Sequence, residues 1–255
     1  MSSIRQVAKS SAVLLLGRER KPRKILRGLA AGYRICVSPC DNLGYLLGTT
    51  EPHLQRVIRQ YVSAGDTAYD IGANVGYVSL SLAKRVGPQG QVFAFEPIPQ
   101  TFDWLEKNVK LNQLDNITTL MVAASDRPGE TTIRIPESLS MSSLVWHRND
   151  PSAIELPIKT VVIDELVKTG SVPPPQFVKI DVEGAEGLVV EGMRGTIADC
   201  KPILFLECSE IGRATTWPLL SELGYRCHAA ATRTPVKAFE QYRNADFLWL
   251  PSHSR

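Results

Sequence analysis

The chain has 255 residues, of which 44% are hydrophobic and 22% are charged. This composition is ordinary for a soluble globular protein with one large domain, or one domain and an appendage. The longest uncharged apolar run near the start, Ala12–Gly17, is too short to span a bilayer or to form a full signal sequence. The five cysteines contain no C-x-x-C pair, which argues against a zinc site or a disulfide framework and indicates reduced thiols in a cytoplasmic protein.

Residues 1–45 show no clean hydrophobic period, and we predict a basic N-terminal extension or cap, partly helical, ahead of a catalytic domain at 46–255. Residues 18–27 hold six Lys and Arg against Glu19, a local charge of +5, whereas the whole chain is +3. The run is interpreted as a solvated extension, with peripheral contact to an anionic membrane or an acidic substrate as the alternative. Nucleic acid is not expected, because no aromatic residue lies among these charges to stack on bases.

From residue 52 onward the pattern alternates between helices and strands. We predict core strands at 67–71, 91–95, 117–123, 177–181 and 202–207, and helices at 52–61, 75–86, 101–112, 185–198 and 217–223. Extra strands are expected at 131–135 and 154–160, around a polar insert at 136–153, and a final hairpin at 225–228 and 246–250. This order indicates an α/β fold with a doubly wound, mostly parallel sheet.

The most informative segment is Asp70-Ile-Gly-Ala-Asn-Val-Gly76, which follows a buried strand and precedes a helix. Gly72 and Gly76 allow the backbone to approach a ligand closely. The spacing departs from the G-x-G-x-x-G fingerprint of dinucleotide binding, and a carboxylate at Asp70 would repel a pyrophosphate. The Asp70 carboxylate suits the ammonium and sulfonium groups of S-adenosylmethionine. Glu96, at the end of the next strand, can accept hydrogen bonds from both hydroxyls of a ribose. The alternative is an ordinary crossover between two strands.

Ligands of open α/β sheets bind at the carboxyl ends of the strands, and acidic residues end several strands here. Ser125 or Asp126 can receive the adenine amine, although Asp126 could instead only begin a turn. Asp181 is the first candidate for a base that accepts a hydroxyl proton, with Glu183 second and His147 in the insert third. Further alternatives are that Lys179 pairs with a neighbouring carboxylate, that Glu207 is structural, and that Asp181 and Glu207 hold Mg²⁺.

These motifs resemble the FkbM-type methyltransferases, a branch of the class I S-adenosylmethionine-dependent enzymes. The resemblance runs from about residue 46 to the end, and its carriers are residues 70–76, 95–97, 123–126, 142–144, 161–166 and 178–186. It implies a Rossmann-like sheet of seven strands with an antiparallel last strand, and Asp181 and Glu183 in the active site. The full cofactor-binding set that we predict is Asp70, Gly72, Asn74, Gly76, Glu96, Pro97, Ser125, Asp126 and Asp181. On the acceptor side we place Glu51, His53, Ser142, Ser143 and Glu207.

The resemblance thus implies methylation of a hydroxyl on a sugar, glycolipid or secondary metabolite by in-line transfer. N-methylation is an alternative, but the Asp/Asn-Pro-Pro-aromatic motif common in that chemistry is absent from the sequence. A nicotinamide-dependent oxidoreductase is disfavoured by the missing glycine fingerprint, and a non-catalytic cofactor-binding subunit by the acidic residues at Asp70, Glu96 and Asp181. The partner expected is a small-molecule or glycan acceptor, and a homo-oligomer is left open.

Overall fold

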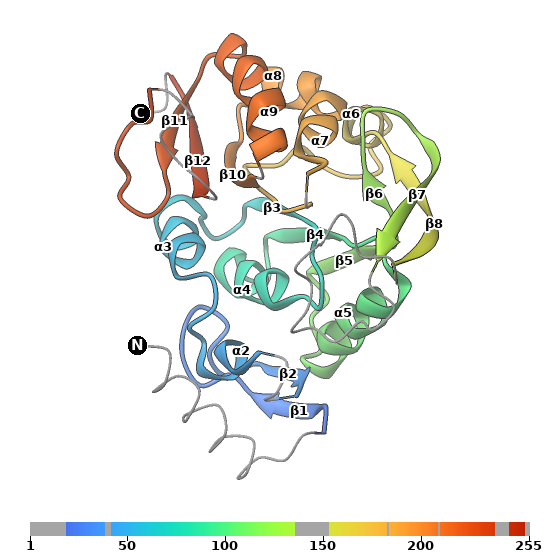
Figure 1. Cartoon of the computed structure of the whole chain (residues 1–255). Coiled ribbons are helices and arrows are strands. Elements are labelled where there is room, and N and C mark those ends of the chain that lie inside the picture. Colours follow the sequence, from blue (N-terminus) through green and yellow to red (C-terminus); the bar gives the residue numbers. More distant parts are fainter. Residues whose placement is uncertain are drawn as a thin grey trace.

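The computed structural model describes residues 19–38, 42–135, 153–182, 184–208, 210–237 and 245–252, which form a doubly wound α/β fold (Figure 1). Its main sheet has seven strands in the order β11-β12-β10-β9-β3-β4-β5. These are β3 (Thr67–Ile71), β4 (Gln91–Phe95), β5 (Ile117–Leu120), β9 (Phe177–Ile180), β10 (Ile203–Cys208), β11 (Tyr225–Ala229) and β12 (Ala245–Pro251). The central strands are parallel and β12 is antiparallel to both of its neighbours. The predicted fold class, including the antiparallel last strand, is confirmed.

Helices cover both faces of this sheet, as the alternating sequence pattern requires. In Figure 1, α3 (Pro52–Tyr61), α4 (Tyr77–Val86) and α5 (Pro99–Leu111) lie on one side. The helices α6 (Ile163–Lys168), α7 (Glu186–Gly192), α8 (Arg194–Cys200) and α9 (Glu210–Glu222) lie on the other. Alternate strand residues feed two separate hydrophobic cores: Ala68 packs in the core with α4, while Tyr69 and Ile71 pack in the core with α7.

A small hairpin precedes this domain. Its strands are β1 (Lys21–Lys24) and β2 (Arg34–Val37), followed by the short helix α2 (Leu43–Leu47). We predicted an N-terminal cap or a partly helical extension at 1–45; in the described part of this segment, residues 21–37 contain the hairpin and α2 begins at Leu43. Strand β2 is tied to α5, because Asn108 accepts a hydrogen bond from the Cys36 amide and Asn112 accepts one from the Arg34 amide, each at 2.7 Å. Side chains that are remote in sequence thus satisfy the backbone of this edge strand, a partnership that no local pattern reveals.

A second, three-stranded sheet lies beside the edge of the main one. It consists of β6 (Ala123–Ala124), β7 (Gly129–Ile135) and β8 (Ile154–Val161), in the order β6-β8-β7. The extra strands around the insert are thus confirmed, whereas the predicted strand at 117–123 ends at Leu120 and its last residue belongs to this second sheet.

Two helix predictions are wrong in their bounds. The helix expected at 185–198 is two helices, α7 and α8, divided at Met193. Next to the break, the end of α7 lies against the chain after β6, because a Cβ at Gly192 would lie 1.9 Å from the carbonyl oxygen of Ser125. Helix α9 begins at Glu210, seven residues before the expected start. No helix in the described ranges is long and apolar enough to cross a bilayer.

Candidate active site

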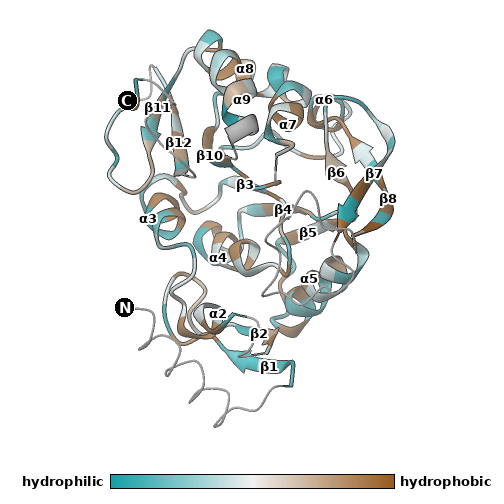
Figure 2. Cartoon of the chain, in the orientation of Figure 1, coloured by the Kyte–Doolittle hydropathy of each residue, from teal (hydrophilic) through white to brown (hydrophobic). Residues whose placement is uncertain are grey.

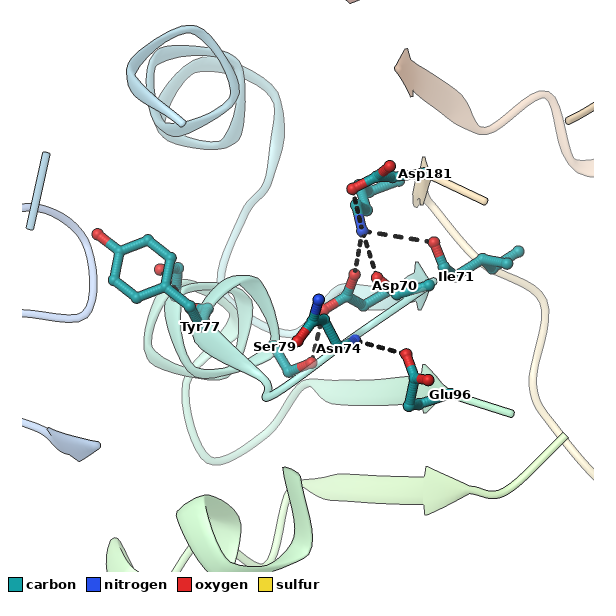
Figure 3. Close-up of polar contacts among 10 residues, drawn as sticks. Asp70, Ile71, Asn74, Tyr77, Ser79, Glu96 and Asp181 are labelled. Carbon is teal, nitrogen blue, oxygen red and sulfur yellow. Dashed lines mark hydrogen bonds and ion pairs between the residues drawn. The ribbon is translucent and has the colours of Figure 1, made fainter. Parts of the chain in front are cut away.

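The carboxylate of Asp70 lies beneath the glycine turn in a buried network (Figure 3). Asp70 and Lys179 are register partners on the adjacent parallel strands β3 and β9, and their charged atoms are 3.2 Å apart. Ser79 on α4 donates a hydrogen bond to the other carboxylate oxygen at 2.5 Å. The Asp70 side chain is 0% exposed and that of Lys179 is 5% exposed. The interpretation that Lys179 pairs with a neighbouring carboxylate is therefore confirmed.

Lys179 also connects the turn to the end of its own strand. Its Nζ donates a hydrogen bond of 2.7 Å to the Gly72 carbonyl oxygen and lies 3.4 Å from a carboxylate oxygen of Asp181. Burial by itself would lower the pKa of Lys179, but the carboxylates of Asp70 and Asp181 outweigh it and raise the pKa above its ordinary value. The ammonium group therefore stays charged and holds the turn, Asp70 and Asp181 together.

The turn itself has an unusual backbone, with φ of +79° at Gly72, +51° at Asn74 and +87° at Gly76. A Cβ at Gly72 would lie 1.9 Å from the Asp181 carbonyl oxygen, and one at Gly76 would lie 2.6 Å from a methyl group of Leu105. Both glycines are thus required by contacts within the protein, in addition to any ligand that approaches the turn.

Glu96 ends β4 and is held rigidly by the turn. One of its carboxylate oxygens accepts a hydrogen bond from the Asn74 amide at 2.8 Å, and the other accepts hydrogen bonds from the Ile98 amide and the Thr101 hydroxyl. Burial raises the pKa of Glu96, while the hydrogen bonds from Thr101, Ile98 and Asn74 lower it. Since each carboxylate oxygen can accept two hydrogen bonds, the oxygen bonded to Asn74 keeps one position for a ligand.

A pocket opens at the carboxyl ends of β3, β9 and β10. Its lining comes from the glycine turn, from those strand ends and from α2, α3 and α4, and comprises Tyr45, Thr50, Glu51, Leu54, Gly72, Ala73, Asn74, Tyr77, Val78, Lys179, Asp181, Phe205 and Glu207. The structure therefore brings the predicted Gly72, Asn74, Asp181, Glu51 and Glu207 into one cavity. Asp70 and Glu96 lie outside its lining.

Carboxylates dominate the electrostatics of this pocket. Burial and then the neighbouring charges of Asp181, Glu51 and Asp246 raise the pKa of Glu207 to about 8. The pKa of Glu51 is raised by burial, Asp246 and Asp181, and that of Asp246 by burial and Asp181 against an opposing effect of His53. The charge of Lys179 opposes these shifts by lowering the pKa of both Glu207 and Glu51.

Sequence reasoning missed three residues at this site. Asp246 faces Glu207 directly because β10 and β12 pair antiparallel in that register, so the start of the last strand lies at the carboxyl edge of the parallel ones. Tyr45 and Tyr77 stack with ring centroids 4.9 Å apart, and burial raises the pKa of each phenol to about 12. An aspartate just before the apolar run Phe247–Leu250 is the signal that could have revealed Asp246.

Four of the other predicted residues, Ser125, Asp126, His53 and Pro97, are not part of the pocket lining. Ser125 is buried, and its hydroxyl donates a hydrogen bond to Asp126, which also pairs with Arg127. Hydrogen bonds from Arg127 and Ser125 hold the pKa of Asp126 below its ordinary value. His53 lies on α3, hydrogen-bonded to Arg56, and Pro97 precedes α5. Glu183, His147, Ser142 and Ser143 lie outside the described residues.

Asn74 and Glu51 carry features that fit a ligand at this pocket. Asn74 Oδ1 is buried without a hydrogen-bond partner in the part of the chain that the structure describes. Glu51, like Asn74, is a non-glycine residue with a left-handed backbone, at φ +52°. Such backbone strain is concentrated at functional sites. No group of three or more His, Cys, Asp or Glu among the described residues is placed to hold a metal ion, so the Mg²⁺ predicted at Asp181 and Glu207 has no support there.

Comparison with known proteins identifies the family. A model of the methyltransferase FkbM domain matches residues 70–227, from Asp70 in β3 to Cys227 in β11, which is more than half of the chain. The chain belongs to the FkbM methyltransferase family. The resemblance seen in the sequence motifs is thereby confirmed, and the matched region contains the turn and the ends of β9 and β10.

Individual relatives cover parts of this FkbM-family chain. It is 33% identical over 158 residues to the hexuronic acid methyltransferase AglP of Haloferax volcanii, a match covering 58% of each chain. It is 32% identical over 156 residues to methyltransferase sdnD of Sordaria araneosa, covering 49% of this chain and 59% of that one. The matches therefore span less than two thirds of these relatives. Among solved structures, the FkbM methyltransferase of Methylobacillus flagellatus aligns over 73% of this chain and 44% of its own, with 21% identity and a TM-score of 0.49.

Proposed function

We propose that this chain is an S-adenosylmethionine-dependent O-methyltransferase that acts on a hydroxyl of a sugar, glycolipid or secondary metabolite. The observation that supports it is the pocket at the carboxyl ends of β3, β9 and β10, most of whose lining residues belong to the region matched by the family model. S-adenosylmethionine, when bound, supplies an electrophilic methyl group on a sulfonium. The carboxylates of the pocket match the positive charges of that ligand, and the Glu96 oxygen with a free position, together with Asn74 Oδ1, offers hydrogen bonds to its uncharged part.

Within this proposal Glu207 is the base that removes the proton of the acceptor hydroxyl. The sequence favoured Asp181 for this role, but its carboxylate is already engaged within the protein, 3.4 Å from the Lys179 ammonium. Glu207 has a pKa of about 8 and lies on the neighbouring strand, and a base whose pKa is near the working pH is the more effective one. Asp181 then acts in positioning, through Lys179 and the turn.

The charge of the pocket also indicates the class of acceptor. The one cation in the lining, Lys179, is already engaged by Asp70 and Asp181, so the described lining offers no free positive partner to an acceptor that carries its own carboxylate. We therefore place a neutral or cationic hydroxyl compound in this pocket, such as a neutral or amino sugar. In this respect the proposed acceptor differs from the hexuronic acid named for the relative AglP.

Isothermal titration with S-adenosylhomocysteine, with NAD as the control ligand, tests the cofactor. Glu96→Gln should weaken the binding about tenfold or more, because a hydrogen bond to a charged group contributes about 1.5–3 kcal/mol. Glu155→Gln on the exposed strand β8 should have no effect. Binding of NAD in place of S-adenosylhomocysteine, or of neither ligand, would refute the proposal.

Transfer of a radioactive methyl group to a panel of neutral sugars, amino sugars and hexuronates tests the acceptor. Labelled product with an alkali-stable ether on a neutral or amino sugar supports the proposal, and transfer to an amine would assign N-methylation instead. Tight binding of S-adenosylhomocysteine without transfer to any compound would favour a non-catalytic subunit. The free thiols of Cys36, Cys200, Cys208 and Cys227 fit the cytoplasmic location that we propose for this reaction.

A further inference from the structure

The hairpin and α2 present two large apolar side chains to solvent at one place. Leu26, in the loop between β1 and β2, is 63% exposed, and Leu47, at the end of α2, is 41% exposed. Their segments are in backbone contact, because the Leu26 amide donates a hydrogen bond of 2.9 Å to the Leu46 carbonyl oxygen. A Cβ on Gly48 would lie only 1.8 Å from the carbonyl oxygen of Arg27. The two exposed leucines therefore lie on segments that are packed side by side, and we call them the leucine pair.

Positive charge surrounds the leucine pair. Lys24 and Arg34 are opposite each other in the β1–β2 register, Arg27 follows Leu26 in the chain, and all three are exposed. Figure 2 shows β1 as hydrophilic along its length. The described residues 19–38 and 42–50 contain six Lys and Arg but only one acidic residue, Glu19, which pairs with Lys21.

This surface is built rigidly onto the active-site pocket. Gln55 of α3 is buried and accepts a hydrogen bond from the Leu29 amide in the hairpin loop, while its amide group donates to the carbonyl oxygens of Gly48 and Thr50 and to the Tyr77 hydroxyl. Helix α2 carries Leu47 on its exposed side and Tyr45 in the lining of the pocket. A surface that contacts the leucine pair is therefore held beside the pocket.

We infer that the leucine pair and the cations Lys24, Arg27 and Arg34 form a docking site for an anionic lipid bilayer. Exposed apolar side chains enter the boundary between headgroups and acyl chains, while surrounding Lys and Arg contact the anionic headgroups. The combination selects a bilayer over a soluble polyanion, because a soluble polyanion has no apolar phase to receive the leucines. The inference goes beyond the proposed function and does not depend on methyl transfer.

Co-sedimentation of the full chain with phosphatidylcholine vesicles, with and without phosphatidylglycerol, tests this inference. The protein should bind the anionic vesicles and leave the neutral ones in solution. Each cation near an anionic surface strengthens binding about fivefold, so Lys24→Gln combined with Arg27→Gln should weaken it about twenty-fivefold. Leu26→Ser combined with Leu47→Ser should weaken it severalfold, at unchanged net charge.

A matched control removes the same charge elsewhere, with Lys159→Gln on β8 and Lys168→Gln on α6, both exposed and far from the hairpin in Figure 1. This variant should sediment like the unmodified protein. Titration with S-adenosylhomocysteine, unchanged in all variants, would show that the fold and the pocket survive and would separate this result from the test of function. Equal loss of binding in the control, binding that ignores the leucine substitutions, or equal affinity for soluble polyphosphate would overturn the inference.

Discussion

The buried pair of Asp70 and Lys179 provides the sharpest test of how this site is built. Replacing Lys179 by Met removes the cation beside the Asp70 carboxylate, which is 0% exposed. The hydrogen bond from the Ser79 hydroxyl to that carboxylate remains. Breaking a buried ion pair by removing one partner costs about 3–5 kcal/mol, because the other charge is left uncompensated. We therefore expect Lys179→Met to lower the free energy of unfolding by about that amount.

The pair is best measured as a double-mutant cycle in urea or guanidinium unfolding. Asp70→Asn alone should also destabilise the protein, because the Lys179 ammonium then lacks its closest carboxylate. The double variant removes both charges, so its loss should be smaller than the sum of the single losses by about 1–3 kcal/mol. Unfolding must be monitored by two probes, so that two-state behaviour is established for a chain of this size.

An exposed ion pair serves as the control. Arg194 lies 2.6 Å from Glu222, with side chains that are 43% and 65% exposed. Arg194→Met should change the free energy of unfolding by less than about 1 kcal/mol. If Lys179→Met proves as mild as this control, or if the two single losses simply add, the reasoning that a buried pair holds the turn would be refuted.

Four further outcomes are expected. The turnover rate should rise with pH through about 8, because Glu207 acts as a base only when it is deprotonated, and Glu207→Gln should remove this limb of the pH profile. The same raised pKa means that folded Glu207 holds a proton that the unfolded state has lost. The free energy of unfolding should therefore fall as pH rises from the unfolded pKa of Glu207 toward 8. The Glu207→Gln variant should lack this part of the pH dependence. Gly72→Ala should be far more destabilising than Gly65→Ala. Both positions have positive φ, but an added Cβ at Gly72 would lie 1.9 Å from a neighbouring atom, whereas one at Gly65 would have no neighbour within 4 Å. Equal melting temperatures of the two variants would contradict this reasoning. Glu51→Gly should be more stable than Glu51→Ala by about 1 kcal/mol, because glycine relieves the strain of φ +52°; a reversed order in thermal unfolding would show that Glu51 is not strained.

Local signals were sufficient for much of the main sheet. Helix α3 and strands β3 and β4 have the bounds that the sequence predicts, because Pro52 starts the helix and a glycine precedes each of the two strands. The division of the helix at Met193 was not predictable, since the apolar period continues through it. Beside the break, Gly192 closely approaches Ser125, a contact that exists only after the chain has folded.

The hairpin shows the same limit from the other direction. Its strands are short and basic, with little periodicity. Strand β2 is held by Asn108 and Asn112, which accept hydrogen bonds from backbone amides 72 and 78 residues away in the chain. Those asparagines read as ordinary polar residues of α5. Partners at such separation leave no signal within a window of sequence that a local pattern can detect.

At the site, the sequence by itself determined which residues end the strands, and therefore that Gly72, Asn74, Asp181 and Glu207 meet at one edge of a parallel sheet. The tertiary structure decided which of the acidic groups face the pocket and which are paired with other groups of the protein. Register placed Asp70 against Lys179 and buried both, while the antiparallel direction of β12 brought Asp246 to Glu207. Strand order and register follow from the packing of the whole sheet, and they decide which charged groups lie beside one another.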